Sequence, residues 1–253
     1  MARFLIIGGN GRLGQAIIHH LHGPNTVYSP PRVLCNVTLL EQLEVYAKHC
    51  TPEIVINCAG IKPPLSETDP ILSARVNTFG AGNVAHACNK LEIRLVHIST
   101  DAVFSGGWET PGIGRYIPYS ENTLTGTPVN QYGTTKAIGE TRVRSICPSA
   151  LVIRAGFRHD GPWPYPSAFT DAYRSHMWLG QIVPEIVAAA KMMDLSGILH
   201  IGGEKKSVYE MAREVSPEVK PCLLEDFKDF PVPRDVSMDS SKWARIKRER
   251  GLV

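Results

Sequence analysis

RFLIIGGNGRLG, residues 3–14, joins a short apolar run to a glycine-rich turn. Apolar side chains then recur at helical spacing through Leu13, Ile17 and Leu21. A strand, a glycine turn and a helix in this order predict a dinucleotide-binding unit, because glycines let the backbone approach a pyrophosphate at the positive end of the helix. A glycine-rich turn without a ligand is the alternative, and the two flanking elements favour the first interpretation. The candidate cofactor-loop residues are Gly8, Asn10, Gly11, Arg12, Leu13 and Gly14.

Stretches typical of strands and helices alternate over the first hundred residues. The predicted strands after the first are residues 26–28, 53–58 and 94–99. Thr38 and Glu41 have the spacing of a capping box and predict a helix to about residue 49, while Asp69 before Pro70 predicts a helix to about residue 90. The alternation predicts an α/β fold with a Rossmann-type, doubly wound parallel sheet.

Two further motifs carry candidate chemistry. Thr100 follows the predicted strand 94–99, at the edge where open α/β sheets bind ligands. Tyr132 and Lys136 lie four residues apart, so they share one face of a helix that we expect to end near residue 147. A lysine ammonium beside a phenol favours the phenolate, which predicts a lowered pKa and a general acid. Taken alone, such a pair is more often two exposed side chains; its weight comes from the other two motifs.

The second half of the chain is less regular. The long polar segment 104–131 is predicted to be a functional loop, and residues 156–180 are aromatic and proline-rich without a clear period. We expect residues 1–155 to form the NADP-binding Rossmann domain. Residues 156–253 are expected to form a small substrate-binding lobe interleaved with late Rossmann elements, among them a helix at 182–193 and a strand at 198–201.

Composition excludes several classes of protein. Of the 253 residues 43% are hydrophobic and 20% charged, and the net charge of +3 is too small to indicate a nucleic-acid partner. The N-terminal apolar run is too short for a signal peptide or a membrane helix. The six cysteines show no zinc-like spacing, so we expect reduced thiols, a cytoplasmic location and no metal site.

The end of the second predicted strand bears on the choice of cofactor. Sites specific for NAD usually carry an acid there, but Tyr28 is followed by Ser29 and two prolines. Arg32 or Arg12 would instead pair with a 2′-phosphate, which favours NADPH over NADH; either arginine is otherwise a surface residue.

The motifs also resemble those of a known family, the extended short-chain dehydrogenase/reductases. The strongest matches are Gly8-x-x-Gly11-x-x-Gly14, Ser99-Thr100-Asp101-Ala102-Val103-Phe104 and Tyr132-Gly133-Thr134-Thr135-Lys136-Ala137-x-Gly139-Glu140. Within that family the chain is similar to the branch of dTDP-4-dehydrorhamnose reductases, through Tyr119-Ser120-Glu121, Pro128-Val129-Asn130, Gly197-Ile198-Leu199-His200, Pro233-Arg234-Asp235 and Asp239-Ser240-Ser241-Lys242. The resemblance covers most of the chain.

This resemblance implies the NADPH-dependent reduction of a keto group on a nucleotide-activated sugar. Tyr132 would protonate the developing alkoxide, Lys136 would hold the nicotinamide ribose and lower the tyrosine pKa, and Thr100 would orient the carbonyl oxygen. Relatives line or support the cofactor groove at the positions of Asn57, Ala59 and Asn77. A homodimer is the assembly expected if the chain associates.

Three alternatives stay open. A dehydratase would usually carry Asp-Glu after the threonine, but Ala102 follows Asp101 here. A 4-epimerase would normally hold NAD through an acid after the second strand. A non-catalytic, NADP-binding regulatory subunit is the rival from a different class, and the intact Thr100, Tyr132 and Lys136 argue against it.

Departures from the family pattern, at residues 36–37, 61–64 and 157–180, concern the substrate more than the chemistry. A sugar diphosphate carries two negative charges and needs fixed donors, which arginine supplies best. The candidate substrate-binding residues are Arg154, Arg158, Arg174 and Arg234. For each one alone a surface salt bridge is the better expectation, but at least one should face the pocket.

Overall fold

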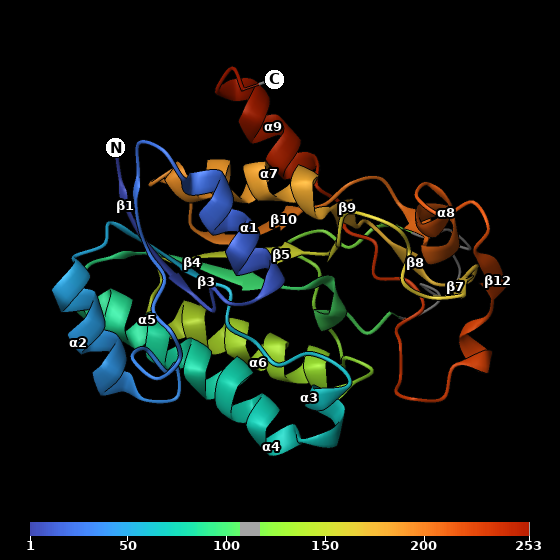
Figure 1. Cartoon of the computed structure of the whole chain (residues 1–253), viewed down its shortest axis with the longest axis horizontal. Helices are drawn as coiled ribbons and strands as arrows, with labels where there is room; N and C mark the ends of the chain where they lie inside the picture. The colour runs from blue at the N-terminus through green and yellow to red at the C-terminus, as the bar shows by residue number, and fades with distance from the viewer. Residues whose placement is uncertain (107–116, 253) are drawn as a thin grey trace.

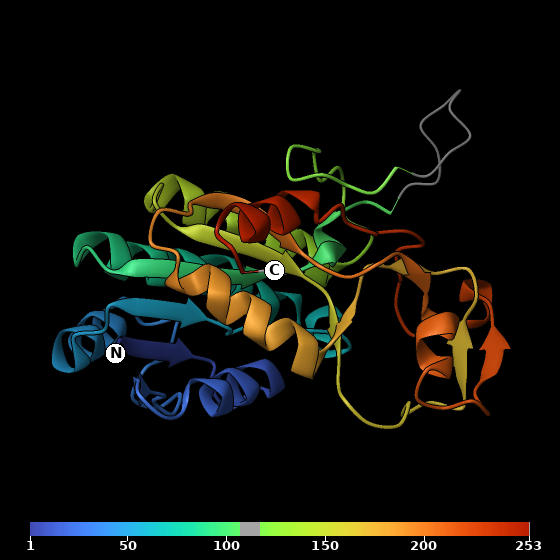
Figure 2. The ribbon, with the colours of Figure 1, turned by 90° about the horizontal axis from the view of Figure 1, so that it is seen from above.

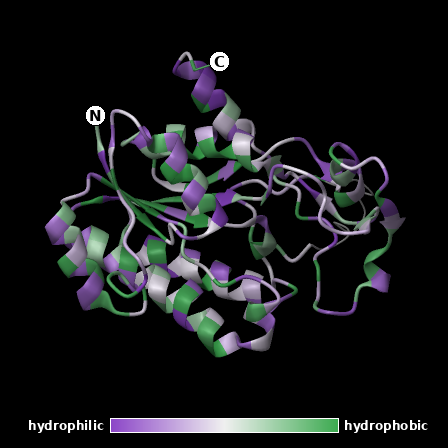
Figure 3. Cartoon of the chain, in the orientation of Figure 1, coloured by the Kyte–Doolittle hydropathy of each residue, from purple (hydrophilic) through white to green (hydrophobic). Residues whose placement is uncertain are grey.

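The computed structural model describes residues 1–106 and 117–252. Its centre is a six-stranded parallel sheet in the order β10-β5-β4-β3-β1-β2. The strands are β1 (Arg3–Ile7), β2 (Thr26–Tyr28), β3 (Ile54–Asn57), β4 (Arg94–Ser99), β5 (Leu151–Ala155) and β10 (Gly197–Ile201). The inner strands are buried and apolar, as Figure 3 shows, which is typical of a parallel sheet covered on both faces. The predicted Rossmann-type fold is confirmed.

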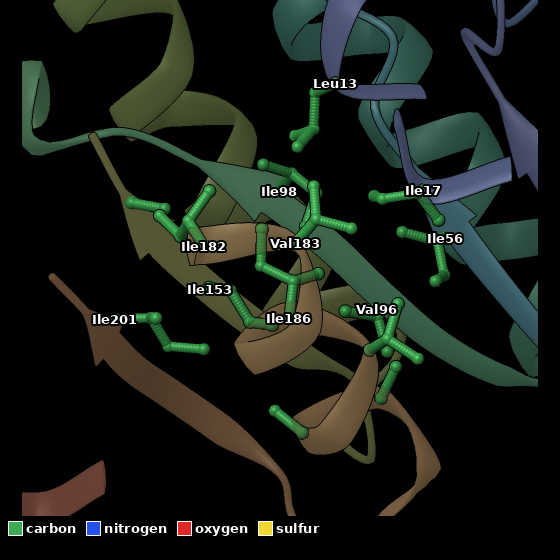
Figure 4. Close-up of a cluster of buried hydrophobic side chains, with 14 of the residues drawn as sticks. Leu13, Ile17, Ile56, Val96, Ile98, Ile153, Ile182, Val183, Ile186 and Ile201 are labelled. Carbon is green, nitrogen blue, oxygen red and sulfur yellow. The ribbon is translucent and has the colours of Figure 1, made fainter. Parts of the chain in front are cut away.

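Helices cover both faces of the sheet (Figure 1). One face carries α1 (Arg12–Leu21), α7 (Leu179–Lys191) and α9 (Ser241–Glu249), and the other carries α2 (Leu40–Cys50), α5 (Ala81–Lys90) and α6 (Gln131–Ile146). Figure 4 shows the core on the first face, where Ile182 and Ile186 of α7 pack against Ile153 and Val96. The apolar stripe of each helix therefore accounts for its place on the sheet.

The strand order reverses between β3 and β1, and the carboxyl ends of the neighbouring strands meet there. Ile7, Asn57 and Ser99 end β1, β3 and β4 side by side on this edge. Open α/β sheets bind ligands in the crevice at such a reversal. The fold thus brings the glycine turn and Thr100 to one edge.

Two predicted helix starts have different outcomes. The prediction of a capping box at Thr38 is wrong. The Thr38 hydroxyl donates to Asn36 Oδ1 at 3.0 Å, and α2 begins at Leu40 without a side-chain cap. The Asp69 cap is confirmed, because its Oδ1 accepts the Leu72 N–H at 2.9 Å. The helix expected after it is divided into α4 (Pro70–Ser73), the π-helix η1 (Ala74–Gly80) and α5.

A small lobe lies apart from the sheet, at the right of Figure 2. It has a core of its own, built around Ala168, Ala172 and Val208. Its elements are β7 (Ser167–Phe169), β8 (Tyr173–Arg174), β11 (Lys206–Ser207), α8 (Val208–Arg213), β12 (Lys220–Cys222) and η3 (Leu224–Asp226). The paired strands β6 (Phe157–Arg158) and β9 (Met177–Trp178) connect it to the sheet, because Phe157 and Met177 pack against the sheet core. In the described residues, no helix is long and apolar enough to cross a membrane.

Candidate active site

At two positions of the glycine turn after β1, other backbone atoms lie too close for a larger residue. Gly8 has a φ of +79°, and a Cβ there would lie 2.6 Å from the Ala59 nitrogen. A Cβ on Gly14 would lie 2.6 Å from the Gly8 carbonyl oxygen. Gly11 is different, since its Cβ would meet only the Gly8 oxygen, at 3.3 Å. Gly8 and Gly14 therefore shape the turn, and Gly11 leaves its outer side open.

Helix α1 begins at this turn with its first N–H groups uncapped by any side chain and with no acidic residue in its first turn. Leu13 is buried in the core, while Asn10 and Arg12 are exposed. Such a helix start favours an anion, so the residues present fit the pyrophosphate of a dinucleotide. Arg32, also exposed, follows the neighbouring strand β2, so both arginines lie on the carboxyl side of adjacent strands.

Two buried asparagines support the loop that follows β3. Asn57 accepts the Ala59 N–H on Oδ1 at 3.1 Å. Asn77 accepts the Ile61 N–H at 2.7 Å and donates to the Ile61 carbonyl at 2.8 Å. Asn77 also donates to Thr135 of α6, at 3.0 Å. Both asparagines therefore fix the loop that follows β3.

Thr100 and Tyr132 come together at the sheet edge. Thr100 caps the short 3-10 helix η2 (Asp101–Val103): its Oγ1 accepts the Ala102 N–H at 3.2 Å and donates to Asp101 Oδ1 at 3.1 Å. Burial raises the pKa of Tyr132 to about 12, although its hydrogen bond with the Thr100 side chain lowers it; the Asp101 charge also raises it. The lowered tyrosine pKa expected from Lys136 is therefore wrong.

Lys136 is turned toward strand β4. Its Nζ donates to the Ile98 carbonyl at 2.6 Å and lies 3.4 Å from His97 Nε2. Burial lowers the pKa of Lys136 to about 8, against Glu140 and Cys58, which raise it. A largely desolvated amine that is not directed at Tyr132 explains why the tyrosine pKa is not lowered.

The first turn of α6 is capped twice. Asn130 Oδ1 accepts the Gly133 N–H at 2.8 Å. Glu67, on the short helix α3 (Leu65–Thr68), accepts the N–H groups of Gln131 and Tyr132 at 2.9 and 3.0 Å. Glu67 thereby holds the backbone of Tyr132. Sequence reasoning missed it, because no local pattern connects residues so far apart in the chain.

A second missed pair lies beside Thr100. The His176 ring contacts Asp101 Oδ2 through Nε2 at 2.8 Å. Burial raises the pKa of Asp101, but His176, Arg174 and Thr100 outweigh it and the net pKa is lowered. Gly156 makes room for the pair, since a Cβ there would lie 2.0 Å from the His176 ring. His176 stands in an unpatterned stretch, so the sequence offered no signal for it.

The four candidate arginines have different surroundings. Arg154 is buried and forms an ion pair with Glu140 at 2.8 Å. Arg174 is buried and donates to the carbonyl groups of Tyr173, Pro233 and Arg234. Arg234 pairs with Asp171 at 3.0 Å. The prediction that Arg154 and Arg174 bind substrate is not supported, because their guanidinium groups are used within the protein.

Arg158 differs from the other three. Its guanidinium lies over the Trp163 ring at 5.2 Å, and its buried Nε has no hydrogen-bond partner among the residues that the structure describes. Burial lowers the pKa of Arg158, against the Asp101 charge, which raises it.

A hollow of about 430 Å³ lies on the lobe side. It is lined by His176, Met177, Trp178, Gln181, Glu185, Gly203, Glu204, Lys206, Met211 and Glu214. No group of three potential metal ligands occurs in residues 1–106 and 117–252.

Comparison with known proteins places this geometry in context. The chain is 32% identical to the dTDP-4-dehydrorhamnose reductase of Mycolicibacterium smegmatis over 161 residues, which are 63% of the chain and 46% of that protein. It is also 31% identical to the methionine adenosyltransferase 2 subunit beta of Xenopus laevis, over 60% of the chain and 46% of that protein. The chain spans about half the length of the curated relatives it matches.

A solved structure agrees with the whole fold. The dTDP-4-dehydrorhamnose reductase of Bacillus anthracis strain Ames, in complex with NADP, superimposes with a TM-score of 0.84 at 24% identity, covering 99% of this chain and 93% of that one. The model of the RmlD substrate binding domain family matches residues 2–161. More than half of the chain, including the glycine turn and the tyrosine helix, falls within that match, and the chain therefore belongs to the RmlD substrate binding domain family.

Proposed function

We propose that this protein reduces the keto group of a nucleotide-activated sugar, with hydride from NADPH and a proton from Tyr132. The observation that carries the proposal is the contact between the Thr100 and Tyr132 hydroxyl groups at the sheet edge. Thr100 directly follows β4, on the edge where β1 also ends, and Tyr132 lies in the first turn of α6. The names of relatives support the substrate class, since they include dTDP-4-dehydrorhamnose reductase and dTDP-4-keto-6-deoxy-D-glucose reductase.

The cofactor would lie across the glycine turn, with its pyrophosphate at the uncapped start of α1. Arg12 or Arg32 would pair with a 2′-phosphate, because no acid follows β2 to compete for it. When bound, the nicotinamide supplies a hydride to the carbonyl carbon. Asn57 and Asn77 would keep the opposite wall of the groove in place through Ala59 and Ile61.

The side chains at the edge would handle the proton. Tyr132 is protonated at neutral pH, since its pKa is about 12, so it is a donor and not a base. It would donate to the carbonyl oxygen as negative charge develops there. Thr100 would fix the direction of the tyrosine hydroxyl, and Asp101, held by His176, fixes Thr100 in turn.

Arg158 is the group that we propose for the diphosphate of the substrate. It carries a charge with an unpartnered Nε at the junction of sheet and lobe, and Trp163 holds its guanidinium plane. A planar fork of this kind suits phosphate oxygens.

The regulatory alternative rests on one relative, the methionine adenosyltransferase 2 subunit beta. A protein with that role would need the cofactor groove but not the proton donor. The presence of Tyr132 and Thr100 in contact favours the enzyme.

The test is an NADPH-oxidation assay over a panel of 4-keto nucleotide sugars. We expect turnover with at least one member, a fall in kcat of roughly 10²–10⁴ for Tyr132→Phe because only the proton donor is lost, and a raised KM for Arg158→Met. Fluorescence titration should show that Tyr132→Phe still binds NADPH. Absence of oxidation with every member, together with stable capture of a partner enzyme, would favour the regulatory alternative.

A further inference from the structure

Three buried side chains form a line beneath the proposed site: Asn57 of β3, His97 of β4 and Lys136 of α6. Their exposed fractions are 1%, 1% and 3%. Asn57 Nδ2 lies 3.2 Å from His97 Nδ1, and His97 Nε2 lies 3.4 Å from Lys136 Nζ. Since water does not reach these groups, their donors and acceptors have to match one another.

The orientation of Asn57 is fixed from outside the line. Its Oδ1 accepts the Ala59 N–H, so Nδ2 is the atom that faces His97 and donates to Nδ1. Nδ1 therefore carries no proton, and a neutral imidazole then has its proton on Nε2. Burial, and then the neighbouring Lys136, lower the pKa of His97 well below its usual value, which disfavours the doubly protonated ring.

The Nε2–H of His97 faces the Lys136 nitrogen as a donor. An ammonium has three donors and no acceptor, so this contact would oppose two donors. A neutral amine resolves the conflict, because its lone pair accepts from His97 while one N–H donates to the Ile98 carbonyl. Lys136 as a neutral amine is thus the form that matches this line.

The groups around Lys136 are compatible with a neutral amine. Glu140, one turn further along α6, favours the ammonium, but Arg154 donates to both of its carboxylate oxygens. Cys58, on the strand side, keeps a thiol proton because burial raises its pKa to about 12. Tyr132, one turn earlier, is protonated. Burial outweighs Glu140 and Cys58 and lowers the pKa of Lys136 to about 8, and the donor on His97 acts in the same direction as burial.

We propose that His97 is a positioning residue that holds Lys136 as a neutral amine in the ligand-free protein, and that Lys136 takes up one proton when NADPH binds. The proton uptake on NADPH binding rests on the proposed function, whereas the role of His97 does not. The Nζ lone pair, released from the His97 Nε2–H, accepts a proton that the acid form of the buffer gives up. The phosphates and ribose oxygens of the cofactor favour the ammonium, which can then lower the pKa of Tyr132.

The first test reads the tautomer of His97 in the ligand-free protein. Imidazole ¹⁵N shifts should show Nδ1 unprotonated and Nε2 protonated across neutral pH. Asn57→Asp, of the same shape, offers a second carboxylate oxygen to Nδ1–H and should reverse the tautomer. The reverse tautomer in the unmodified protein would overturn the proposal, whatever the protein binds or reduces.

The second test counts protons by calorimetry of NADPH binding in buffers of different ionisation enthalpy. With a ligand-free pKa of about 8 or lower, we expect uptake of at least about half a proton per site at pH 8, rising toward pH 9. Lys136→Met should bind with no uptake, and it is the control for this second test whether or not Asn57→Asp folds. Normal binding of NADPH without proton uptake at pH 8 would overturn the proposal. Absence of NADPH binding would overturn both the proposed function and the proton uptake. In that case the tautomer of His97 would still decide its role as a positioning residue.

Discussion

Helices α1 and α6 both begin beside the proposed site, and their first turns are opposite in character. The start of α1 has no side-chain cap and no acid, and Gly11 leaves it open. The start of α6 is closed by Asn130 and by the carboxylate of Glu67. An open start is available to a negatively charged ligand, whereas a closed one fixes the helix that carries Tyr132. One helix start is therefore available for binding, and the other holds Tyr132 in position.

A carboxylate cap at the start of α1 should have the largest effect, and the affected quantity is NADPH affinity. Gly11 has extended backbone angles, φ −74° and ψ 159°, that an aspartate can adopt, so Gly11→Asp supplies the missing cap. We expect stability to be kept or raised by about 1 kcal/mol, while NADPH affinity falls at least about a hundredfold because the carboxylate replaces the cofactor phosphate. Urea unfolding and fluorescence titration measure the two quantities.

Gly11→Ala is the matched control for that variant, since it adds the Cβ without the charge. It should lose much less affinity than Gly11→Asp. Equal affinity in Gly11→Asp and the unmodified protein would show that the open start of α1 does not hold the anion.

Weakening the cap at the start of α6 should have a smaller effect, on stability and kcat. Glu67→Gln removes the charge and one of the two acceptors, so we expect a loss of about 1–2 kcal/mol in the free energy of unfolding. Because the backbone of Tyr132 is released, kcat should fall while the NADPH dissociation constant changes little. Urea unfolding and steady-state kinetics decide this, and a variant that lost cofactor affinity instead would contradict the division between the two helices.

The smallest effect concerns the end of the cofactor that lies farthest from the chemistry. A single arginine–phosphate pair contributes about 1.5–3 kcal/mol, so NADPH should bind at least about tenfold more tightly than NADH. Replacing Arg12 and Arg32 by serine should remove the preference and leave NADH affinity unchanged. Titration of both reduced cofactors provides the measurement; equal affinities in the unmodified protein would rule out a role for either arginine.

Backbone motifs were the part of the site that the sequence could predict. Gly8 and Gly14 fill places where a Cβ would collide, so their spacing reports geometry directly. Arg154 and Arg174 were predicted from residue type and position along the chain alone. Whether an arginine meets a ligand or an internal partner depends on which side chain folds over it, here Glu140 or the backbone of residues 233–234. For the same reason Glu67, His97 and His176 could not be recognised from the sequence.

The polypeptide chain passes between the sheet and the lobe several times. From the sheet, β6 to β9 enter the lobe, α7 and β10 return to the sheet, β11 to η3 enter the lobe again, and α9 ends against β10. Strands β7 and β12, which pair within the lobe, thus flank an entire sheet strand in the chain. No single cut can separate the two parts, and a fragment that ended before the lobe would lack α7, β10 and α9. The lobe of this protein can therefore be exchanged between relatives only by replacing two separate segments together.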